Sequence, residues 1–257
     1  MSEDLEKRLR EAEKEVERLK STLEHYNELI RNTIGPYITD EVLEDIVHHW
    51  GKIEIGGERR FVTMLFTDLR RSTELAEQMD PMDFIDMLNH YMCDMIEIIN
   101  AWQGNILEFV GDAIVVVFGA PRVNEDSARD AVACAVAMQC RMPAVNAWNR
   151  EKGYPEIAMG IGIHSGEAIL GNIGSQTRRK YDMIGQNVNL ASRIEGFTKG
   201  GQILVSTEAL KAAGELVIEN REGSRWVKPK GVKNEIEIHE ITGFGKRTIP
   251  EVEDNGR

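Results

Sequence analysis

The sequence has few cysteines, no long hydrophobic run and no excess of basic residues. Its three cysteines are scattered over 257 residues, and no pair has the spacing of a metal or redox motif. We therefore expect Cys93, Cys134 and Cys140 to be small buried side chains in the reducing environment of the cytoplasm. No stretch approaches the roughly 20 apolar residues that cross a bilayer, and the N-terminus is charged instead of signal-like. The sequence thus predicts a cytoplasmic chain without a membrane segment.

The net charge of −12 restricts the class of partner. Binding to a nucleic-acid backbone requires a clustered basic surface, so this charge disfavours DNA or RNA. It does not disfavour a nucleotide substrate, because a nucleotide arrives with its own metal ions. The content of 42% apolar and 29% charged residues is typical of a globular protein, and 257 residues suffice for one domain with an appendage.

Residues 1–34 carry an unbroken heptad pattern. Apolar side chains follow one another at alternating spacings of 4 and 3 from Leu5 to Ile30, with Glu, Lys and Arg between them. A seven-residue repeat of this length predicts a parallel coiled coil, because the apolar seam of a single helix would stay in water. Gly35-Pro36 then ends the helix.

The further domain boundaries follow from changes in composition. Residues 35–57 are predicted as a linker or transducing segment, with a short helix over 39–48 and a last turn at Gly56-Gly57. Residues 58–245 form the main domain. The polar residues 246–257 form a flexible tail.

Within the main domain, strands and helices alternate. Apolar runs bounded by turn residues predict strands, and periodic apolar positions behind Asp80-Pro81 predict an amphipathic helix. The predicted elements are strand 61–67, a helix from residue 80, strands 106–109 and 113–118, a helix over 125–149, strand 157–164 and an extended segment 166–174. The order βαββαβ predicts an α+β fold of the ferredoxin-like type, with C-terminal additions after residue 175.

Two aspartates end neighbouring strands of this predicted sheet. Asp68 follows strand 61–67, and Asp112 lies in the turn between strands 106–109 and 113–118. In a βαββαβ sheet the first strand lies beside this hairpin, so the two carboxylates meet. Like charges at one place are costly without cations, so the pair predicts a site for divalent metal ions. Backbone N–H groups of the turn after Asp68 can hold phosphate oxygens.

A third polar group lies on a later helix. Asn189 and Arg193 are one turn apart in the helix that begins near Gln186, so they share a face. The guanidinium can stabilise charge on a phosphate, and the amide can orient a ribose. An isolated pair of this kind is also common on the surface of amphipathic helices.

These residues resemble the catalytic domain of the class III adenylate and guanylate cyclases over about residues 58–242. Phe66-Thr67-Asp68-Leu69, the Gly111-Asp112 hairpin and the segment 181–193 match the motifs of that family. The resemblance implies attack of the ribose 3′ oxygen on the α-phosphate of a nucleoside triphosphate, with release of pyrophosphate. It also implies two Mg²⁺ or Mn²⁺ ions per site, bound by Asp68, Asp112 and the carbonyl group of Leu69.

The resemblance assigns further substrate contacts and a dimer. Thr73 belongs to the phosphate turn, where Arg71-Ser72 stands in place of the usual Gly-Phe, and Lys230-Gly231 resembles a phosphate-binding Lys-Gly. In the family, the metal ligands come from one subunit, and the Asn, Arg and Lys come from the other. Since this chain carries both sets, the resemblance implies a homodimer with two equivalent sites. The N-terminal helix resembles those that couple an upstream sensor to cyclase dimers.

Two positions read the purine base in the family, and here they give opposite indications. Glu108 is typical of guanylate cyclases, and Asp182 is typical of adenylate cyclases. Two carboxylates at one purine edge should share a proton, so ATP and GTP both stay open as substrates. Because most single-domain relatives make cyclic AMP, ATP is the preferred interpretation and GTP is the alternative. A catalytically silent nucleotide-binding module is a third interpretation.

Overall fold

The structure, a computed structural model, describes residues 2–33, 55–175, 177–232 and 234–250. The chain divides into two units, Met1–Glu54 and Ile55–Arg257. The described part of the first unit is helix α1 (Ser2–Thr33). The helix predicted over 39–48 lies outside the described residues. None of the described helices is both long and apolar enough to cross a membrane.

Helix α1 bears the predicted apolar seam on its surface. Leu9, Leu19 and Tyr26 are each more than half exposed. Between them, Arg18 pairs with Glu15 at 2.7 Å, an exposed contact of the kind that helices form between residues one turn apart. Because the seam is uncovered in the single chain, the coiled coil stays a prediction about a second copy.

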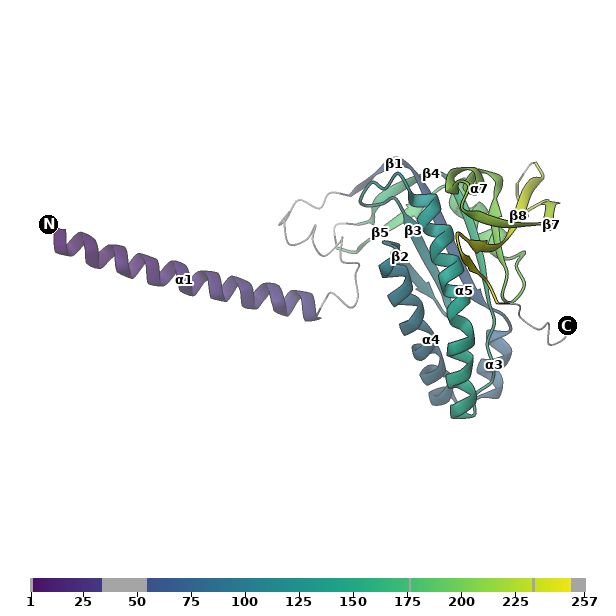
Figure 1. Cartoon of the computed structure of the whole chain (residues 1–257). Helices are drawn as coiled ribbons and strands as arrows, with labels where there is room; N and C mark the ends of the chain where they lie inside the picture. Colours follow the sequence, from purple (N-terminus) through teal and green to yellow (C-terminus); the bar gives the residue numbers. More distant parts are fainter. Residues whose placement is uncertain (1, 34–54, 176, 233, 251–257) are drawn as a thin grey trace. The chain divides into compact units, whose positions relative to one another are not determined.

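The second unit has the predicted order of strands and helices (Figure 1). Its elements are β1 (Gly56–Leu69), α3 (Ser72–Gln78), α4 (Pro81–Ala101), β2 (Asn105–Val110), β3 (Ala113–Phe118), α5 (Ser127–Lys152), β4 (Met159–Gly174), β5 (Arg179–Ile184), α6 (Gln186–Glu195), β6 (Ile203–Ser206), α7 (Thr207–Ala213), β7 (Val217–Val227), β8 (Ile236–Phe244) and β9 (Arg247–Thr248). The carboxylate of Asp80 caps α4 by accepting the N–H of Met82 at 2.9 Å. The prediction of a turn at Gly56-Gly57 is wrong, because β1 begins there. The two extended segments predicted over 157–164 and 166–174 form the single strand β4.

The strands form one sheet with the order β2-β3-β1-β4-β6-β8-β7. Its first four strands are antiparallel, since β1 pairs with β3 and β4, and β2 pairs with β3. This arrangement confirms the predicted α+β, ferredoxin-like fold. Strands β6, β8 and β7 are the C-terminal additions, and they join the sheet through a parallel pair between β4 and β6. Within the predicted tail, β9 pairs with β8, while residues 251–257 lie outside the described part.

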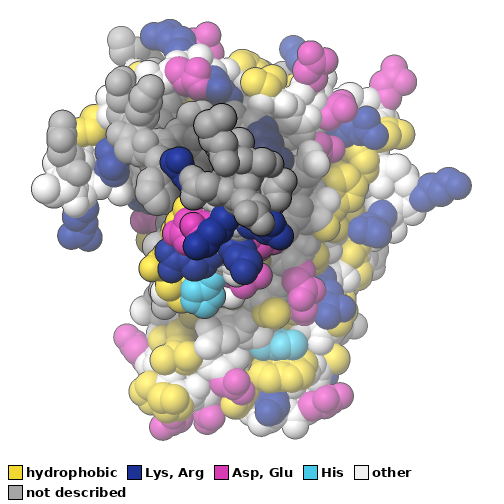
Figure 2. Space-filling view, turned by 90° about the vertical axis from the view of Figure 1, so that its left-hand side faces the viewer, with side chains coloured by type: hydrophobic (Ala, Val, Ile, Leu, Met, Phe, Trp, Pro, Cys, Tyr) yellow, Lys and Arg dark blue, Asp and Glu magenta, His cyan; other side chains and the backbone are white. Residues whose placement is uncertain are grey.

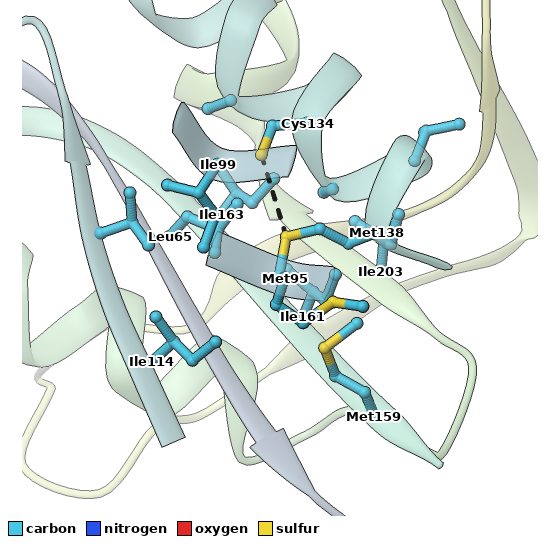
Figure 3. Close-up of a cluster of buried hydrophobic side chains, with 14 of the residues drawn as sticks. Leu65, Met95, Ile99, Ile114, Cys134, Met138, Met159, Ile161, Ile163 and Ile203 are labelled. Carbon is cyan, nitrogen blue, oxygen red and sulfur yellow. Dashed lines mark hydrogen bonds between the residues drawn. The ribbon is translucent and has the colours of Figure 1, made fainter. Parts of the chain in front are cut away.

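Helices α4 and α5 lie side by side on one face of the sheet (Figure 1). Side chains alternate along a strand, so Leu65, Ile161 and Ile163 point toward these helices. They form the main core with Met95 and Met138, and all five side chains are fully buried (Figure 3). Burial of an aliphatic side chain of this size contributes about 1.5–3 kcal/mol, so this core is the main support of the domain.

The three cysteines occupy different environments. Cys134 is fully buried in the main core, where its Sγ lies 3.8 Å from the sulfur of Met138 (Figure 3). Cys140 is partly buried, and Cys93 is exposed on α4. The prediction of three buried cysteines is therefore confirmed for Cys134 and wrong for Cys93, because the buried face of α4 is centred on Tyr91 instead.

On the opposite face of the sheet lie α6 and side chains of β5, which pairs with the end of β4 from Ile169 to Gly174. A second core forms there from Met64 of β1, Leu170 of β4 and Met183 of β5. Tyr181 of β5 and Leu107 of β2 pack against the same core, although β5 and β2 are not neighbours in the sheet. Strand β5 therefore folds back over the sheet toward β2.

Helix α6 lies directly on β4 because the strand presents glycines to it. A Cβ atom at Gly162 would lie 2.2 Å from the backbone nitrogen of Glu195, and one at Gly166 would lie 2.6 Å from Nδ2 of Asn187. A side chain at Gly162 would push the helix away from the sheet, because backbone atoms of Glu195 occupy its place, while at Gly166 the Asn187 side chain would have to shift. Both ends of α6 are thus held at contact distance from β4.

Candidate active site

The structure brings Asp68 and Asp112 together at one edge of the sheet. Strand β1 pairs with β3 up to Thr67 opposite Ile114, which places Asp68 beside the hairpin that carries Asp112. The backbone N–H of Leu69 donates to Oδ2 of Asp112 at 2.9 Å. This hydrogen bond ties the hairpin to the end of β1 and holds the two carboxylates beside each other.

The electrostatics of this pair suit a cation. Burial raises the pKa of Asp68 to about 6, and the neighbouring Asp112 carboxyl adds to the rise, while the Arg70 guanidinium acts in the opposite direction. Two carboxylates and the carbonyl group of Leu69 are hard oxygen donors, which Mg²⁺ and Mn²⁺ prefer. In the described parts of the chain, no three acidic, His or Cys side chains form a cluster that could hold a metal ion. Asp68 and Asp112 are therefore the described side chains that could hold a divalent ion at this edge of the sheet.

Arg70 is a residue of this site that was not predicted from the sequence. Its Nη2 lies 3.7 Å from Oδ2 of Asp68 and pairs with the carboxylate of Glu195, which is only 9% exposed. Nη1 donates to the carbonyl oxygen of Thr198 at 3.5 Å. Burial raises the pKa of Glu195 to about 7, although Arg70 acts against the rise. Arg70 therefore joins the edge that carries Asp68 to the C-terminal end of α6.

The turn after Asp68 has a special backbone at Arg71. Its φ of 61° lies in the left-handed region, which glycine adopts without strain. A non-glycine residue adopts it at a cost of about 1 kcal/mol, so Arg71 holds a backbone conformation that favours glycine. The Arg71 guanidinium points to Glu74, with which it pairs at 2.7 Å, and Thr73 is exposed in the first turn of α3.

Asn189 and Arg193 lie one turn apart on α6, on a different side from Glu195. Consecutive residues of a helix are about 100° apart, so Arg193 and Glu195 point in roughly opposite directions. The guanidinium of Arg193 lies beside Gly231, where a Cβ atom would be 3.4 Å from Nη2. The structure thus brings Arg193 close to Lys230-Gly231, and it turns both away from the Arg70–Glu195 contact.

A buried histidine holds the N-terminal end of α6. Nδ1 of His164 lies 2.7 Å from Oγ of Ser206, and its Nε2 lies 3.2 Å from Oδ1 of Asn187. Burial lowers the pKa of His164, while the contact with Asn187 and the charge of Glu208 act in the opposite direction. A neutral ring that donates from Nε2 to Asn187 and accepts at Nδ1 from Ser206 satisfies both bonds. The histidine thereby fixes the first turn of the helix that carries Asn189.

Lys180 lies between Glu108 and Asp182, the two carboxylates predicted to read the base. Its Nζ pairs with Oε2 of Glu108 and lies 3.3 Å from Oδ2 of Asp182. Asp182 also accepts the N–H of Met183 at 2.9 Å through Oδ1. Acidic and basic side chains also lie next to one another on the face that Figure 2 shows. Because a cation offsets the repulsion between Glu108 and Asp182, the like-charge argument no longer requires them to share a proton.

Comparison with known proteins identifies this combination of fold and side chains. The family model described as Adenylate and Guanylate cyclase catalytic domain matches residues 57–243. Adenylate cyclase 1 of Rhizobium meliloti is 33% identical over 187 residues, which are 72% of this chain and 28% of that protein. The chain therefore spans less than a third of the length of this curated relative.

Two solved structures have the same fold as the second unit. That of the guanylyl cyclase Cya2 is 43% identical with a TM-score of 0.74, and the match covers 76% of this chain and 100% of that chain. That of the adenylyl cyclase CyaB from P. aeruginosa is 30% identical with a TM-score of 0.70, and the match covers 79% of this chain and 100% of that chain. The matched range of the family model includes all the candidate site residues, from Asp68 to Lys230. The chain belongs to the family of adenylate and guanylate cyclase catalytic domains.

Proposed function

We propose that the chain is a homodimeric purine nucleotide cyclase that converts ATP to 3′,5′-cyclic AMP and pyrophosphate. The observation that carries this proposal is the pairing of Asp68 with Asp112 at one edge of the sheet, with the N–H of Leu69 bonded to Asp112. The same chain presents Asn189 and Arg193 one turn apart on α6. A nucleotide cyclase needs both a cation site and a donor group for the α-phosphate.

Each of these side chains has its own role in the proposed reaction. Asp68, Asp112 and the carbonyl group of Leu69 would hold two Mg²⁺ or Mn²⁺ ions, which would supply activation of the 3′ hydroxyl group and neutralisation of phosphate charge. Arg193 stabilises the negative charge that develops on the α-phosphate, and Asn189 orients the ribose. In addition, Lys230 and the turn at Thr73 bind the outer phosphates.

A dimer with shared sites explains why one chain carries groups that face apart. Arg193 points away from the contact that links α6 to Asp68. Arg193 and Asp68 of one chain are therefore suited to two different bound nucleotides, one in each of the two sites of a symmetric dimer. Phe61, Ile169 and Ile184 are large apolar side chains that remain 60%, 45% and 53% exposed on β1, β4 and β5. Exposed apolar surface of this kind is typical of an interface, and the seam of α1 offers a parallel coiled coil as a second contact. A sensor before α1 and a cytoplasmic location belong to the same proposal.

ATP is the first candidate substrate, and GTP is the second. Asp182 can accept a hydrogen bond from the 6-amino group of adenine, and the Rhizobium meliloti relative and CyaB are named as adenylate cyclases. Glu108 can accept from N1–H and the 2-amino group of guanine, and the structure of 43% identity is named as a guanylyl cyclase. An assay with both nucleotides decides whether ATP or GTP is the substrate.

The purified chain is therefore assayed with Mn²⁺ and with ATP and GTP in parallel, and cyclic nucleotide and pyrophosphate are both quantified. We expect cyclic AMP and pyrophosphate in equal amounts, and a loss of at least about 10²-fold in Asp68→Asn. The matched control is Asp126→Asn, since Asp126 is an exposed carboxylate outside the proposed site that pairs with Arg129 at 3.7 Å. If the wild type forms neither cyclic nucleotide, the result contradicts the proposal and favours a silent nucleotide-binding module.

The shared site has its own test. Asp68→Asn and Arg193→Ala are each expected to be inactive alone, and their mixture is expected to recover up to about a quarter of the activity, because half of the dimers then contain one intact site. No recovery after exchange of subunits would contradict shared sites. Removal of residues 1–34 is expected to make the rate fall on dilution, and an unchanged, dilution-insensitive rate would contradict a role of α1 in dimerisation.

A further inference from the structure

Arg70 contacts both the end of α6 and the edge of the sheet that carries Asp68 and Asp112, here called the metal edge. Its Nη2 lies 3.7 Å from Oδ2 of Asp68 and also pairs with the carboxylate of Glu195, the last residue of α6. We infer that Arg70 is a positioning residue that couples cation binding at the metal edge to the position of α6. Because Arg193 lies on another side of the same helix, this coupling reaches from one site of the proposed dimer to the other. The inference rests on the proposed function and adds a link between its two sites.

The side chain of Arg70 passes over a glycine of β4 on its way to α6. A Cβ atom at Gly160 would lie 3.2 Å from Nη2 of Arg70 and 2.0 Å from Oγ1 of Thr198, so a side chain there would close the path. The base of the Arg70 side chain is fixed, because the backbone N–H of this residue donates to the carbonyl oxygen of Ala158 at 2.8 Å. The fold therefore directs the guanidinium from the metal edge toward Glu195.

Besides its ion pairs, the guanidinium has weak contacts on both sides. It donates to the carbonyl oxygen of Asp68 at 3.4 Å and to that of Thr198 at 3.5 Å, and both distances are long for hydrogen bonds. In the described part of the chain, no acceptor lies within hydrogen-bond distance of its buried Nε. The charged group can therefore shift along its path when the charge at one end changes.

Arg70 faces a different charge when a divalent cation is bound at the metal edge. Without the ion, the carboxylate of Asp68 attracts the guanidinium. With the ion, two positive charges lie close together and repel each other, so Arg70 pairs more strongly with Glu195 at the end of α6. The coupling is reciprocal: by drawing the charge of Arg70 away from Asp68, Glu195 favours cation binding at an edge that it does not itself contact.

The test is binding of Mn²⁺ to the purified chain without nucleotide, followed by the electron paramagnetic resonance signal of the free ion. It is made at about pH 8.5, where Glu195 is ionised although burial raises its pKa to about 7. We expect Glu195→Gln to weaken Mn²⁺ binding at least about fivefold, the lower end of typical couplings, because Arg70 then competes with the ion for Asp68. Arg70→Gln should bind Mn²⁺ at least as tightly as the wild type, and so should the double variant Arg70→Gln/Glu195→Gln.

The opposite signs separate coupling from a purely structural role, which would weaken binding in both single variants. If Arg70→Gln does not fold, the double variant decides, because it buries no unpaired charge. The control is Glu74→Gln, since Glu74 pairs with Arg71 at 2.7 Å but the two side chains are 53% and 69% exposed. Its Mn²⁺ affinity should stay within about twofold of the wild type, because water and salt screen this charge. An unchanged affinity in Glu195→Gln, an equal loss in Glu74→Gln, or a double variant as weak as Glu195→Gln overturns the inference.

Mixed dimers of Asp68→Asn and Arg193→Ala follow the coupling to the far side of α6. Their one intact site takes its metal edge from the Arg193→Ala chain and its arginine from the Asp68→Asn chain. Glu195→Gln in the chain with the intact metal edge should raise the Mn²⁺ concentration that gives half of the maximal rate. In the chain that supplies Arg193, the same change should lower kcat at saturating Mn²⁺. Identical effects of the two placements overturn the link between the sites.

Failure of the inference and failure of the proposed function are distinguishable. A wild type that binds Mn²⁺ but forms neither cyclic nucleotide contradicts the function, and the Mn²⁺ affinities of the variants still decide the inference. A wild type that binds no Mn²⁺ overturns the inference, whatever its activity with nucleotide and metal together.

Discussion

The variant Arg70→Met tests whether the contact between the metal edge and α6 stabilises the domain. The side chains of Arg70 and Glu195 are only 26% and 11% exposed, so water screens their attraction little. Arg70 also donates to the carbonyl oxygen of Asp68 at 3.4 Å and to that of Thr198 at 3.5 Å. Methionine keeps the apolar stem and removes every donor, so it leaves the Glu195 carboxylate buried without a cation.

The size of the effect follows from the protonation of Glu195. Burial raises its pKa from the ordinary 4.5 to about 7, even with Arg70 acting in the opposite direction. The folded state therefore binds this proton more tightly than the unfolded state, and the resulting stability is full below about pH 4.5 and lost as the pH rises through about 7. In the wild type, a difference of about 2.5 between the two pKa values corresponds to about 3 kcal/mol of stability that is lost between low and high pH. Without Arg70 the pKa of Glu195 rises further, and removal of one partner of a buried ion pair costs about 3–5 kcal/mol, so we expect Arg70→Met to cost about 3 kcal/mol near pH 8.5 and less near pH 6, where Glu195 is protonated.

Urea denaturation of the wild type and of Arg70→Met at about pH 6 and about pH 8.5 measures this cost. Arg59→Met is the matched control: Arg59 pairs with Glu167 at 3.2 Å, but the two side chains are 72% and 60% exposed, so the loss should be at most about 0.5 kcal/mol at either pH. Adding Glu195→Gln to Arg70→Met removes the buried charge and should remove most of the dependence on pH, with the remainder due to Asp68, whose pKa Arg70 also lowers. Equal costs for Arg70→Met and Arg59→Met, or a cost that does not change with pH, would refute the reasoning.

Three further predictions concern catalysis, metal and pH. Asn189→Ala and Arg193→Ala are each expected to lower kcat by about 10²–10³-fold with an unchanged melting temperature, and Ser192→Ala, on an exposed position of α6, serves as control. Removal of divalent ions with EDTA should abolish activity and Mn²⁺ should restore it, with Asp68→Asn requiring more Mn²⁺; activity in EDTA would contradict a metal mechanism. Because burial lowers the pKa of His164 below 6.5, the folded state resists its protonation, so its contribution to stability is full above pH 6.5 and lost as the pH falls. Melting curves between about pH 5 and about pH 7 should show this loss in the wild type and a smaller one in His164→Gln.

The order of the elements was predictable because each element carries its own pattern. Asp80-Pro81 starts α4 as expected, and apolar runs mark β1, β2 and β3. The full lengths of β1 and β4 were not predictable, because both strands continue through glycines at Gly56-Gly57 and Gly166. Glycine is typical of turns in a single sequence, and only the pairing of β1 with β4 over their whole length makes these residues part of a sheet.

The residues of the candidate site were also predictable only in part. The two aspartates and the Asn/Arg pair were found because each lies in a short motif, and the structure brings the aspartates together, while the chemical roles stay predictions. Lys180 and Arg70 were missed because their partners Glu108 and Glu195 are 72 and 125 residues away. A single charged residue has no periodic pattern that distinguishes it from solvated surface. Its neighbours depend on where β5 folds over the sheet and on how closely α6 approaches β4.

The glycines of β4 explain how one strand supports both the main core and the helix of the candidate site. Ile161 and Ile163 point into the core, while Gly160 and Gly162 face the opposite side. The lack of a side chain at Gly162 therefore leaves the core complete and brings the backbone of α6 into contact with the strand. Alanine there would place its Cβ atom 2.2 Å from the backbone nitrogen of Glu195, so the helix would have to move while the core stays in place. The position of the Asn/Arg pair is thus set by a strand that carries neither residue.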